Sequence, residues 1–278
     1  VEGGKMKVYV GNLPFSVDLA KLKELVKVGL EHTPVRKVSL IGSSLGDLDA
    51  LEDLICWIVD QDIAVSVPSL RADAVTARML DCLVKGGQRT LTIAPETGSS
   101  RLRKEMGKGL NDDAIVDAVK LAEVAGYNSL KLYFIIGLPG ETPSDVEDTA
   151  TMIRTIAQKT RLRVTASVNP FIPKAQTRWQ QEPQPEIEIL RQKIKQVEGS
   201  IKNVPRVTLE TLDLRGARVQ AALSIGDRTL GKVIQIAATY GGYGGWRRAE
   251  KESGVPFFTI ANSTDHLLKG FPWAFLSR

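Results

Sequence analysis

Polar residues that could bind a ligand follow several of the apolar runs in this chain. Glu96 stands in P-E-T-G-S-S, directly after a run expected to form a strand, and its carboxylate can accept hydrogen bonds from sugar hydroxyls or an ammonium group. Ser99 lies in the same segment. Arg71 follows another such run and could clamp a carboxylate. The alternative for each residue is structural, as a helix cap or a surface ion pair.

Glycines give two further loops the backbone freedom that a ligand site needs. The segment G-S-S-L-G-D starts at Gly42, and its small residues let backbone amides approach a charged group that Ser43 and Ser44 can also hydrogen-bond. A plain turn with a helix cap is the alternative. In L-K-L-Y-F-I-I-G-L-P-G-E-T, a strand ends at Ile136 and Gly137 begins a turn, so the apolar edge could lie against a flat heterocycle.

A fifth loop, N-P-F-I-P-K-A-Q-T, is stiffened by two prolines and carries Lys174. A rigid loop is useful where a substrate must be held in position. In parallel α/β sheets, ligands bind beyond the carboxyl ends of the strands. Because such loops follow successive strands, the sequence predicts one shared pocket at that edge.

The elements that must position these loops alternate between short β-branched runs and amphipathic helical runs, which is typical of parallel βαβ units. Strands are expected at 8–10, 37–41, 63–67, 90–94, 129–136, 162–168 and 206–212. Helices are expected at 19–29, 48–60, 72–85, 101–105, 111–125, 144–158, 185–203, 215–240 and 246–253, the last after a break at G-G-Y-G-G-W. The predicted fold class is α/β, a partial (β/α) barrel of about six parallel strands with a C-terminal helical appendage. A doubly wound open sheet is the alternative.

Composition describes an ordinary globular chain. Of the 278 residues, 43% are hydrophobic and 25% charged, and no apolar run of about 18 residues predicts a membrane span. Residues 1–30 do not read as a signal peptide. The net charge of +5 is spread along the chain, so we expect a solvated surface rather than a nucleic-acid footprint, with anionic ligands still possible.

Two cysteines, Cys56 and Cys82, lie within expected helices. Neither has a neighbour at metal-ligand spacing, so we expect two buried thiols, no disulfide and an intracellular, reducing compartment.

Taken together, S-L-I-G-S-S-L-G-D, S-V-P-S-L-R-A-D, T-I-A-P-E-T-G-S-S-R-L-R, K-L-Y-F-I-I-G-L-P-G-E-T and N-P-F-I-P-K-A-Q-T resemble, in order, the radical SAM enzymes. The closest likeness is to a subgroup that often carries a cobalamin-binding domain, and it runs from about residue 30 to residue 272. These enzymes cleave S-adenosylmethionine with a 4Fe-4S cluster to give a 5′-deoxyadenosyl radical. The resemblance implies that Gly42 to Ser44 contact the amino end of S-adenosylmethionine. It implies that Glu96 and Ser99 face its ribose and methionine portion, and that Ile136 and Gly137 back its adenine.

The departure from the family lies after the first strand, where the family has a C-x-x-x-C-x-x-C loop whose thiolates hold the cluster. Here that position reads G-N-L-P-F-S-V-D, without cysteine. The run V-Y-V-G-N-L-P-F, from Val8 to Phe15, instead resembles the first motif of an RNA-recognition domain, but the second motif is missing. We therefore expect the chain to bind no cluster and to be inactive alone.

The sequence predicts three parts: a leader over 1–29 that fills the first βα unit structurally, a radical-SAM-like barrel over 30–212, and a helical region over 213–278. The first functional hypothesis is a truncated radical SAM protein that binds S-adenosylmethionine as a small-molecule cofactor, with an unknown substrate and no membrane partner. The alternatives are a non-catalytic module that binds S-adenosylmethionine or RNA, and an unrelated (β/α) barrel enzyme.

Overall fold

The structure is a computed structural model of the chain, and it describes residues 17–34, 36–42, 45, 48–265, 267 and 270–276. The strand predicted at 8–10 lies outside the described residues. The other six predicted strands are present, within a few residues of their expected bounds. They are β1 (Lys37–Ser39), β2 (Ala64–Ser66), β3 (Thr90–Glu96), β4 (Ser129–Ile136), β5 (Arg163–Pro170) and β6 (Val207–Glu210).

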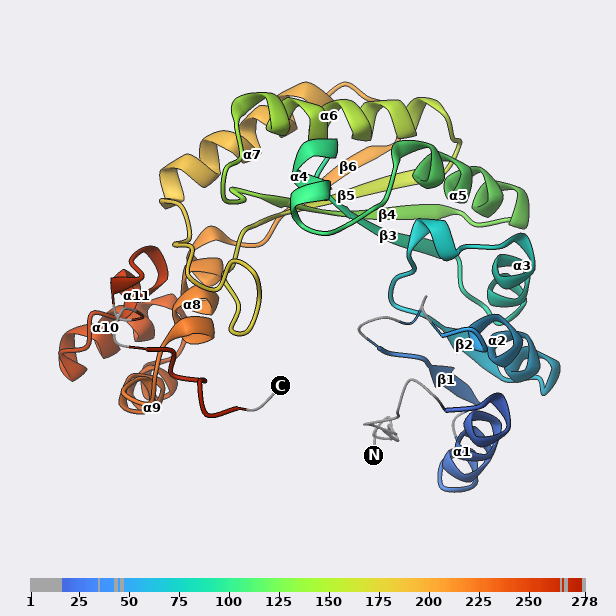
Figure 1. The fold of residues 1–278 in the computed structure, drawn as a ribbon, viewed down its shortest axis with the longest axis horizontal. Helices are drawn as coiled ribbons and strands as arrows, with labels where there is room; N and C mark the ends of the chain where they lie inside the picture. Colours follow the sequence, from blue (N-terminus) through green and yellow to red (C-terminus); the bar gives the residue numbers. More distant parts are fainter. Residues whose placement is uncertain are drawn as a thin grey trace.

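All the strand pairings are parallel, in the orders β1-β2 and β3-β4-β5-β6. A parallel bridge between Leu70, in the segment after β2, and Ile93 of β3 connects the two sheets, and the Leu70 N–H donates to the Thr92 carbonyl at 3.0 Å. The result is a wall of six parallel strands that bends into an arch (Figure 1). The fold is therefore the α/β partial barrel that the sequence predicts.

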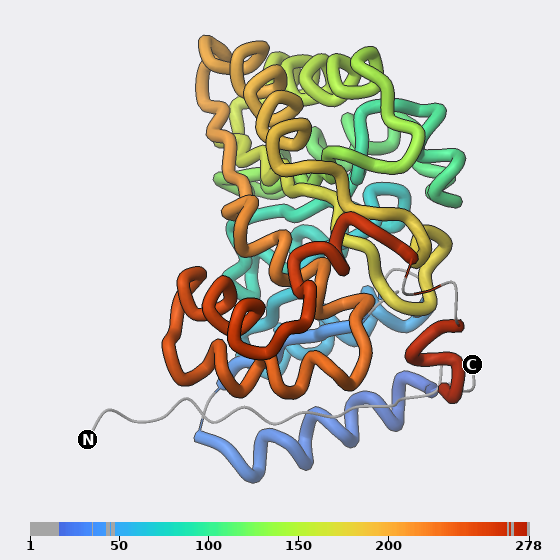
Figure 2. The backbone as a smooth tube through the Cα atoms, turned by 90° about the vertical axis from the view of Figure 1, so that its left-hand side faces the viewer, coloured from blue at the N-terminus to red at the C-terminus, as the bar shows by residue number. Residues whose placement is uncertain are grey.

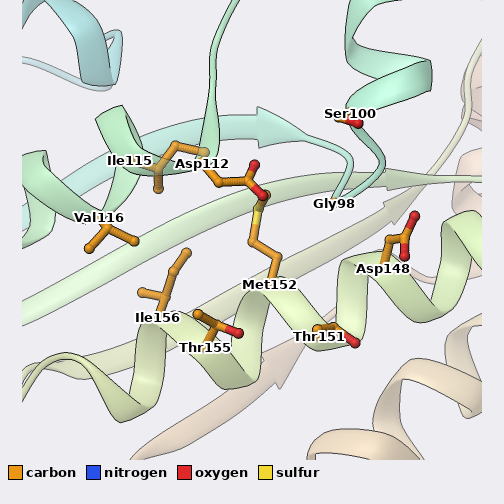
Figure 3. Close-up of a pocket in the computed structure, with 10 residues that line it drawn as sticks. All are labelled: Gly98, Ser100, Asp112, Ile115, Val116, Asp148, Thr151, Met152, Thr155 and Ile156. Carbon is orange, nitrogen blue, oxygen red and sulfur yellow. The ribbon is translucent and has the colours of Figure 1, made fainter.

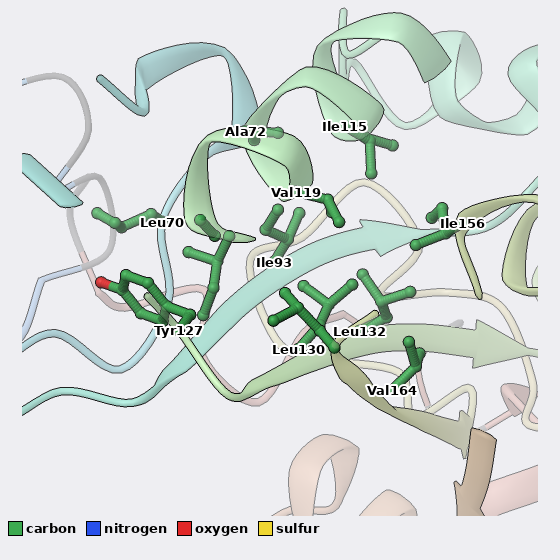
Figure 4. Close-up of a cluster of buried hydrophobic side chains, with 14 of the residues drawn as sticks. Leu70, Ala72, Ile93, Ile115, Val119, Tyr127, Leu130, Leu132, Ile156 and Val164 are labelled. Carbon is green, nitrogen blue, oxygen red and sulfur yellow. The ribbon is translucent and has the colours of Figure 1, made fainter. Parts of the chain in front are cut away.

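The helices before and between the strands cover the outer face of this wall (Figure 1). They are α1 (Leu19–Glu31), α2 (Leu51–Asp60), the 3₁₀ helix η2 (Ala72–Ala74), α3 (Ala77–Lys85), α4 (Ser100–Glu105), α5 (Asp112–Ala125), α6 (Pro143–Gln158) and α7 (Ile187–Ile201). Side chains alternate along β4, so Leu130 and Leu132 point outward into the core beneath α5, beside Ile93 of β3 (Figure 4). Within the described residues, no helix is long and apolar enough to cross a membrane.

The C-terminal helices form a second core beside the wall. They are α8 (Leu214–Ile225), α9 (Leu230–Tyr240), α10 (Gly242–Ser253) and α11 (Phe257–Asn262). Their buried residues, such as Val233, Ala249 and Phe257, form a cluster of their own. These helices lie at one end of the arch (Figure 1), and the side view shows α1 on the opposite side of the molecule from α6 and α7 (Figure 2).

Two C-terminal predictions are wrong in detail. The helix expected at 215–240 is broken into α8 and α9. Gly226 caps the end of α8 at Ile225, and the Asp227 carboxylate accepts the Thr229 N–H before α9 begins. The glycine run was expected to interrupt the helices up to Trp246, but α10 already starts within it, at Gly242. A side chain on Gly245 would come within 2.8 Å of the Ala237 carbonyl oxygen, so glycine is what lets α10 pack closely on α9.

The expectation of two free thiols is also wrong. Cys56 on α2 and Cys82 on α3 form a disulfide, with their Cα atoms 5.2 Å apart. The two helices pack side by side and bring residues 26 positions apart within bonding range. The apolar surroundings predicted for both cysteines are correct, but the contact between the two helices cannot be read from either segment alone.

Candidate functional site at the carboxyl edge of the wall

Because all the described strands are parallel, their carboxyl ends meet at one edge of the wall, and the predicted loops follow them there. Contacts tie the loops after β3, β4 and β5 together. The Arg101 guanidinium donates to the Gly140 carbonyl at 2.9 Å, and the Phe171 N–H donates to the Ile136 carbonyl at 2.8 Å. The structure therefore brings Glu96, Ser99 and Gly137 to one connected edge.

Glu96 has an unusual backbone at the end of β3. Its φ is +68°, in the left-handed region that non-glycine residues rarely adopt, and the β3–β4 register shifts between Ile93 and Glu96. The Lys108 ammonium holds the side chain, because its Nζ lies 2.6 Å from a Glu96 oxygen and 2.8 Å from the Ala94 carbonyl oxygen. A strained backbone and an ion pair thus fix one carboxylate at the predicted site.

Ser99 is a buried cap rather than an exposed ligand group. Its hydroxyl accepts the Leu102 N–H at the start of α4 and donates to the Asp145 carboxylate of α6. Asp145 also accepts bonds from the Thr142 N–H at 2.8 Å and the Arg101 guanidinium at 2.6 Å. Burial raises the pKa of the Asp145 carboxyl, but the bonds from Ser99, Thr142 and Arg101 outweigh burial and hold this pKa well below its usual range.

This carboxylate makes stability depend on acid in a definite direction. A carboxyl whose pKa is lowered by folding stabilises the fold above its unfolded pKa of about 4, and the stabilisation is lost as the pH falls below that value. We expect Asp145→Asn to be less stable than wild type at pH 7. We also expect a shallower loss of stability between about pH 5 and pH 2.

Urea unfolding at a series of pH values measures this effect. Asp148→Asn is the matched control, because Asp148 is exposed on the same helix. Equal slopes for Asp145→Asn and Asp148→Asn would contradict the role given to the Asp145 network.

The loop after β4 is shaped by Gly137. Its φ is +79°, and a side chain there would come within 2.5 Å of Leu190 on α7. Its N–H donates to the Glu141 carboxylate at 2.8 Å, and Lys193 of α7 pairs with the same oxygen at 2.6 Å. Burial raises the pKa of Glu141 despite this partner. The turn is therefore fixed from inside the fold.

Ile136 has its side chain fully buried in the core on the helix face, so only its backbone is at the edge. Ile135, one residue earlier, points to the opposite face and packs with Leu138 and Phe171. Leu138 and Phe171 are buried and Ile135 is half-buried, so of these three Ile135 is the one that presents apolar surface at the edge.

The remaining predicted residues are less closely joined to this edge. Arg71 pairs with Asp73 at 2.7 Å, and Lys174 donates to Ser224 of α8 at 3.1 Å. Gly42 follows β1 and lies against Leu45. Ser43 and Ser44 lie outside the described residues.

A cavity of about 250 Å³ lies on the outer face between α5 and α6 (Figure 3). Asp112 and Asp148 line it together with the apolar side chains of Ile115 and Met152. Gly98 reaches this cavity from the loop after β3. None of the predicted site residues lines it.

Sequence reasoning missed two residues that organise the edge. Lys108 lies between two glycines after α4, a position that suggests a turn and gives no sign of its partner Glu96. Arg103 is 2% exposed, and its guanidinium donates to the carbonyls of Thr97, Gly98 and Leu110. A basic residue inside a short amphipathic helix suggests an exposed side chain, so only the fold reveals this role.

Comparison with known proteins defines the class. The sequence model of the Radical SAM superfamily matches residues 7–153, which is more than half of the chain. The chain therefore belongs to the radical SAM superfamily. An uncharacterised protein of Methanocaldococcus jannaschii is 34% identical over 220 residues, covering 79% of this chain and 48% of the relative. A protein of Pyrococcus horikoshii, called an uncharacterised methyltransferase, is 35% identical over 81 residues, covering 29% of this chain and 17% of the relative.

The chain thus spans less than half the length of these relatives. Among solved structures, methylornithine synthase is 17% identical with a TM-score of 0.46, covering 74% of this chain and 60% of that one. Coproporphyrinogen III oxidase from Escherichia coli, described as a radical SAM enzyme, is 15% identical with a TM-score of 0.47, covering 61% and 41%.

The family implies S-adenosylmethionine and a 4Fe-4S cluster. The residues of this chain suit the first better than the second. Three thiolates must hold the cluster, whereas the chain has two cysteines, both in the α2–α3 disulfide. In the described part of the chain, no group of three or more His, Cys, Asp or Glu is placed to hold a metal ion. The residues present therefore do not fit the cluster. The edge of the wall offers a fixed carboxylate, tight glycine turns and an apolar surface, which suit a nucleoside.

Proposed function

We propose that this chain binds S-adenosylmethionine at the carboxyl edge of the wall and, on its own, does not cleave it reductively. The observation that carries the proposal is Glu96, held at a positive φ and paired with Lys108. A carboxylate fixed in this way can accept hydrogen bonds from the ribose hydroxyls without having to be ordered on binding. Membership of the radical SAM superfamily indicates that the nucleoside recognised by this arrangement would be S-adenosylmethionine.

The other predicted residues have supporting roles in this proposal. The backbone of Ile136 and Gly137 would lie along the adenine, with Ile135 supplying apolar contact. The loop from Gly42 to Ser44 would face the amino end of the ligand. Ser99 would act by holding the loop after β3 against α6, because Asp145 and the Leu102 N–H already engage its hydroxyl.

Arg71 and Lys174, on the neighbouring loops, would contact anionic groups of the ligand in place of their present partners Asp73 and Ser224. Without cluster thiolates, the chain binds and orients the nucleoside but supplies no electron to the sulfonium. Membership of the subgroup that often carries a cobalamin-binding domain, and the three-part division of the chain, stay predictions.

Calorimetric titration with S-adenosylmethionine tests the proposal. We expect saturable binding by the wild type and a loss of about tenfold or more in affinity for Glu96→Gln and for Lys108→Met, because each removes one partner of a charge-assisted contact. Lys104→Met is the matched control, since it removes a lysine from the exposed surface of the neighbouring helix α4. Absence of binding by the wild type, or equal affinity in all four proteins, would overturn the site.

The catalytic half of the proposal has its own measurement. After anaerobic incubation with iron and sulfide, we expect no stoichiometric cluster and no 5′-deoxyadenosine on addition of a reductant. Formation of both would show that ligands other than a three-cysteine loop hold the cluster.

A further inference from the structure

The inner face of the wall, opposite α5, α6 and α7, carries polar side chains along β4, β5 and β6. The outward positions of these strands are filled by core residues such as Leu132 and Ala166, so the alternate positions point inward. In register across the three strands they form two rows: Lys131, Thr165 and Thr208, then Tyr133, Ser167 and Glu210. Closed barrels fill this space with bulky branched side chains. Packing of a barrel interior therefore does not explain why these inner positions of β4, β5 and β6 are polar.

An ion pair spans this face. The Lys131 Nζ lies 2.8 Å from a Glu210 oxygen, although the two residues stand on strands separated by β5. The short side chains of Thr165 and Ser167 on β5 leave room for the long ones to reach across. Lys131 also lies over the Tyr133 ring, with Nζ 5.5 Å from the ring centroid. The wall thus presents one cation, one anion and one aromatic face close together.

This pair can be opened by a ligand. The side chains of Lys131 and Glu210 are 30% and 53% exposed, and ion pairs with that access to water contribute little to stability. A ligand with one charge would leave the other partner unpaired. A ligand with both charges replaces the pair completely, its carboxylate on Lys131 and its ammonium on Glu210, and can rest its side chain on Tyr133.

We propose that this inner face binds a zwitterionic α-amino acid. This inference rests on the proposed function in one respect, because S-adenosylmethionine bound at the neighbouring edge would then lie next to the amino acid. Binding of the amino acid itself does not require S-adenosylmethionine, so the two proposals can fail separately.

The test is saturation-transfer NMR of the full chain with each common L-amino acid, without S-adenosylmethionine. We expect at least one to saturate with a Kd below about 1 mM. Its amide and its decarboxylated amine, which each lack the negative charge, and the corresponding carboxylic acid without the amino group should bind at least about tenfold more weakly. If no amino acid saturates, or if the single-charge analogues bind equally well, the proposal is overturned.

Variants separate recognition from folding. Lys131→Gln and Glu210→Gln should each weaken binding at least about tenfold. Lys120→Gln, which removes an exposed lysine paired with Asp117 on α5, should have no effect. Thr165→Leu should block binding while keeping both charges, because it fills the space beneath the pair. Unchanged affinity in the Lys131, Glu210 and Thr165 variants would mean that the ion pair is an ordinary surface contact, and it would overturn the proposed amino acid site.

Discussion

Gly98→Ala is expected to lower the free energy of unfolding by about 3 kcal/mol, at the upper end for one added methyl group. A Cβ at Gly98 would lie 2.3 Å from the Asp148 carbonyl oxygen and 2.4 Å from the Thr149 Cα. These are main-chain atoms of α6, so no side-chain rotation relieves the contact. The Gly98 N–H also donates to the Thr149 hydroxyl at 2.9 Å, and this bond would be lost if the loop moved away.

Urea unfolding measures the loss, and Gly109→Ala is the matched control because a Cβ there meets nothing within 4 Å. The effect should extend to the site, since Glu96 lies two residues from Gly98 and would shift with the loop. Wild-type stability in Gly98→Ala would mean that this loop does not lie against α6.

The second large effect concerns the disulfide. Reduction of the Cys56–Cys82 bond should lower stability by about 3 kcal/mol, because the bond closes a loop across 26 positions and restricts the unfolded chain. That loop contains β2, a strand of three residues whose one strand partner in the described part of the chain is the equally short β1. The bond therefore supports the weakest part of the wall.

Thermal unfolding with and without a reductant measures the effect. A Cys56→Ser, Cys82→Ser double variant should match the reduced wild type and should not respond to the reductant. Titration of two free thiols in the unreduced, denatured protein would contradict the bond.

Local periodicity was enough to predict the six strands that the structure describes and the helices that pack on them. The run from Leu130 to Ile136 is apolar at nearly every position, so the sequence indicates a strand but not which side chains face inward. The burial of Ile136 and the inner position of Ile135 therefore emerge only from packing. In the same way, the glycines after Tyr240 suggested a break, although one of them permits a close helix contact instead.

The site could be predicted as a set of loops but not as a set of contacts. Glu96 was found because it follows a strand. Its positive φ and its pairing with Lys108 depend on a register shift and on a loop twelve residues further along. The Cys56–Cys82 bond and the Lys131–Glu210 pair were missed for the same reason, since each joins residues that are distant in sequence.

The left-handed backbone at Glu96 has a consequence for selection on this position. A side chain in that conformation costs about 1 kcal/mol relative to glycine. Selection for a well-folded chain alone would favour glycine or asparagine there. A glutamate at this position therefore reflects a trade-off, in which a less favourable backbone conformation is accepted in order to place a carboxylate there.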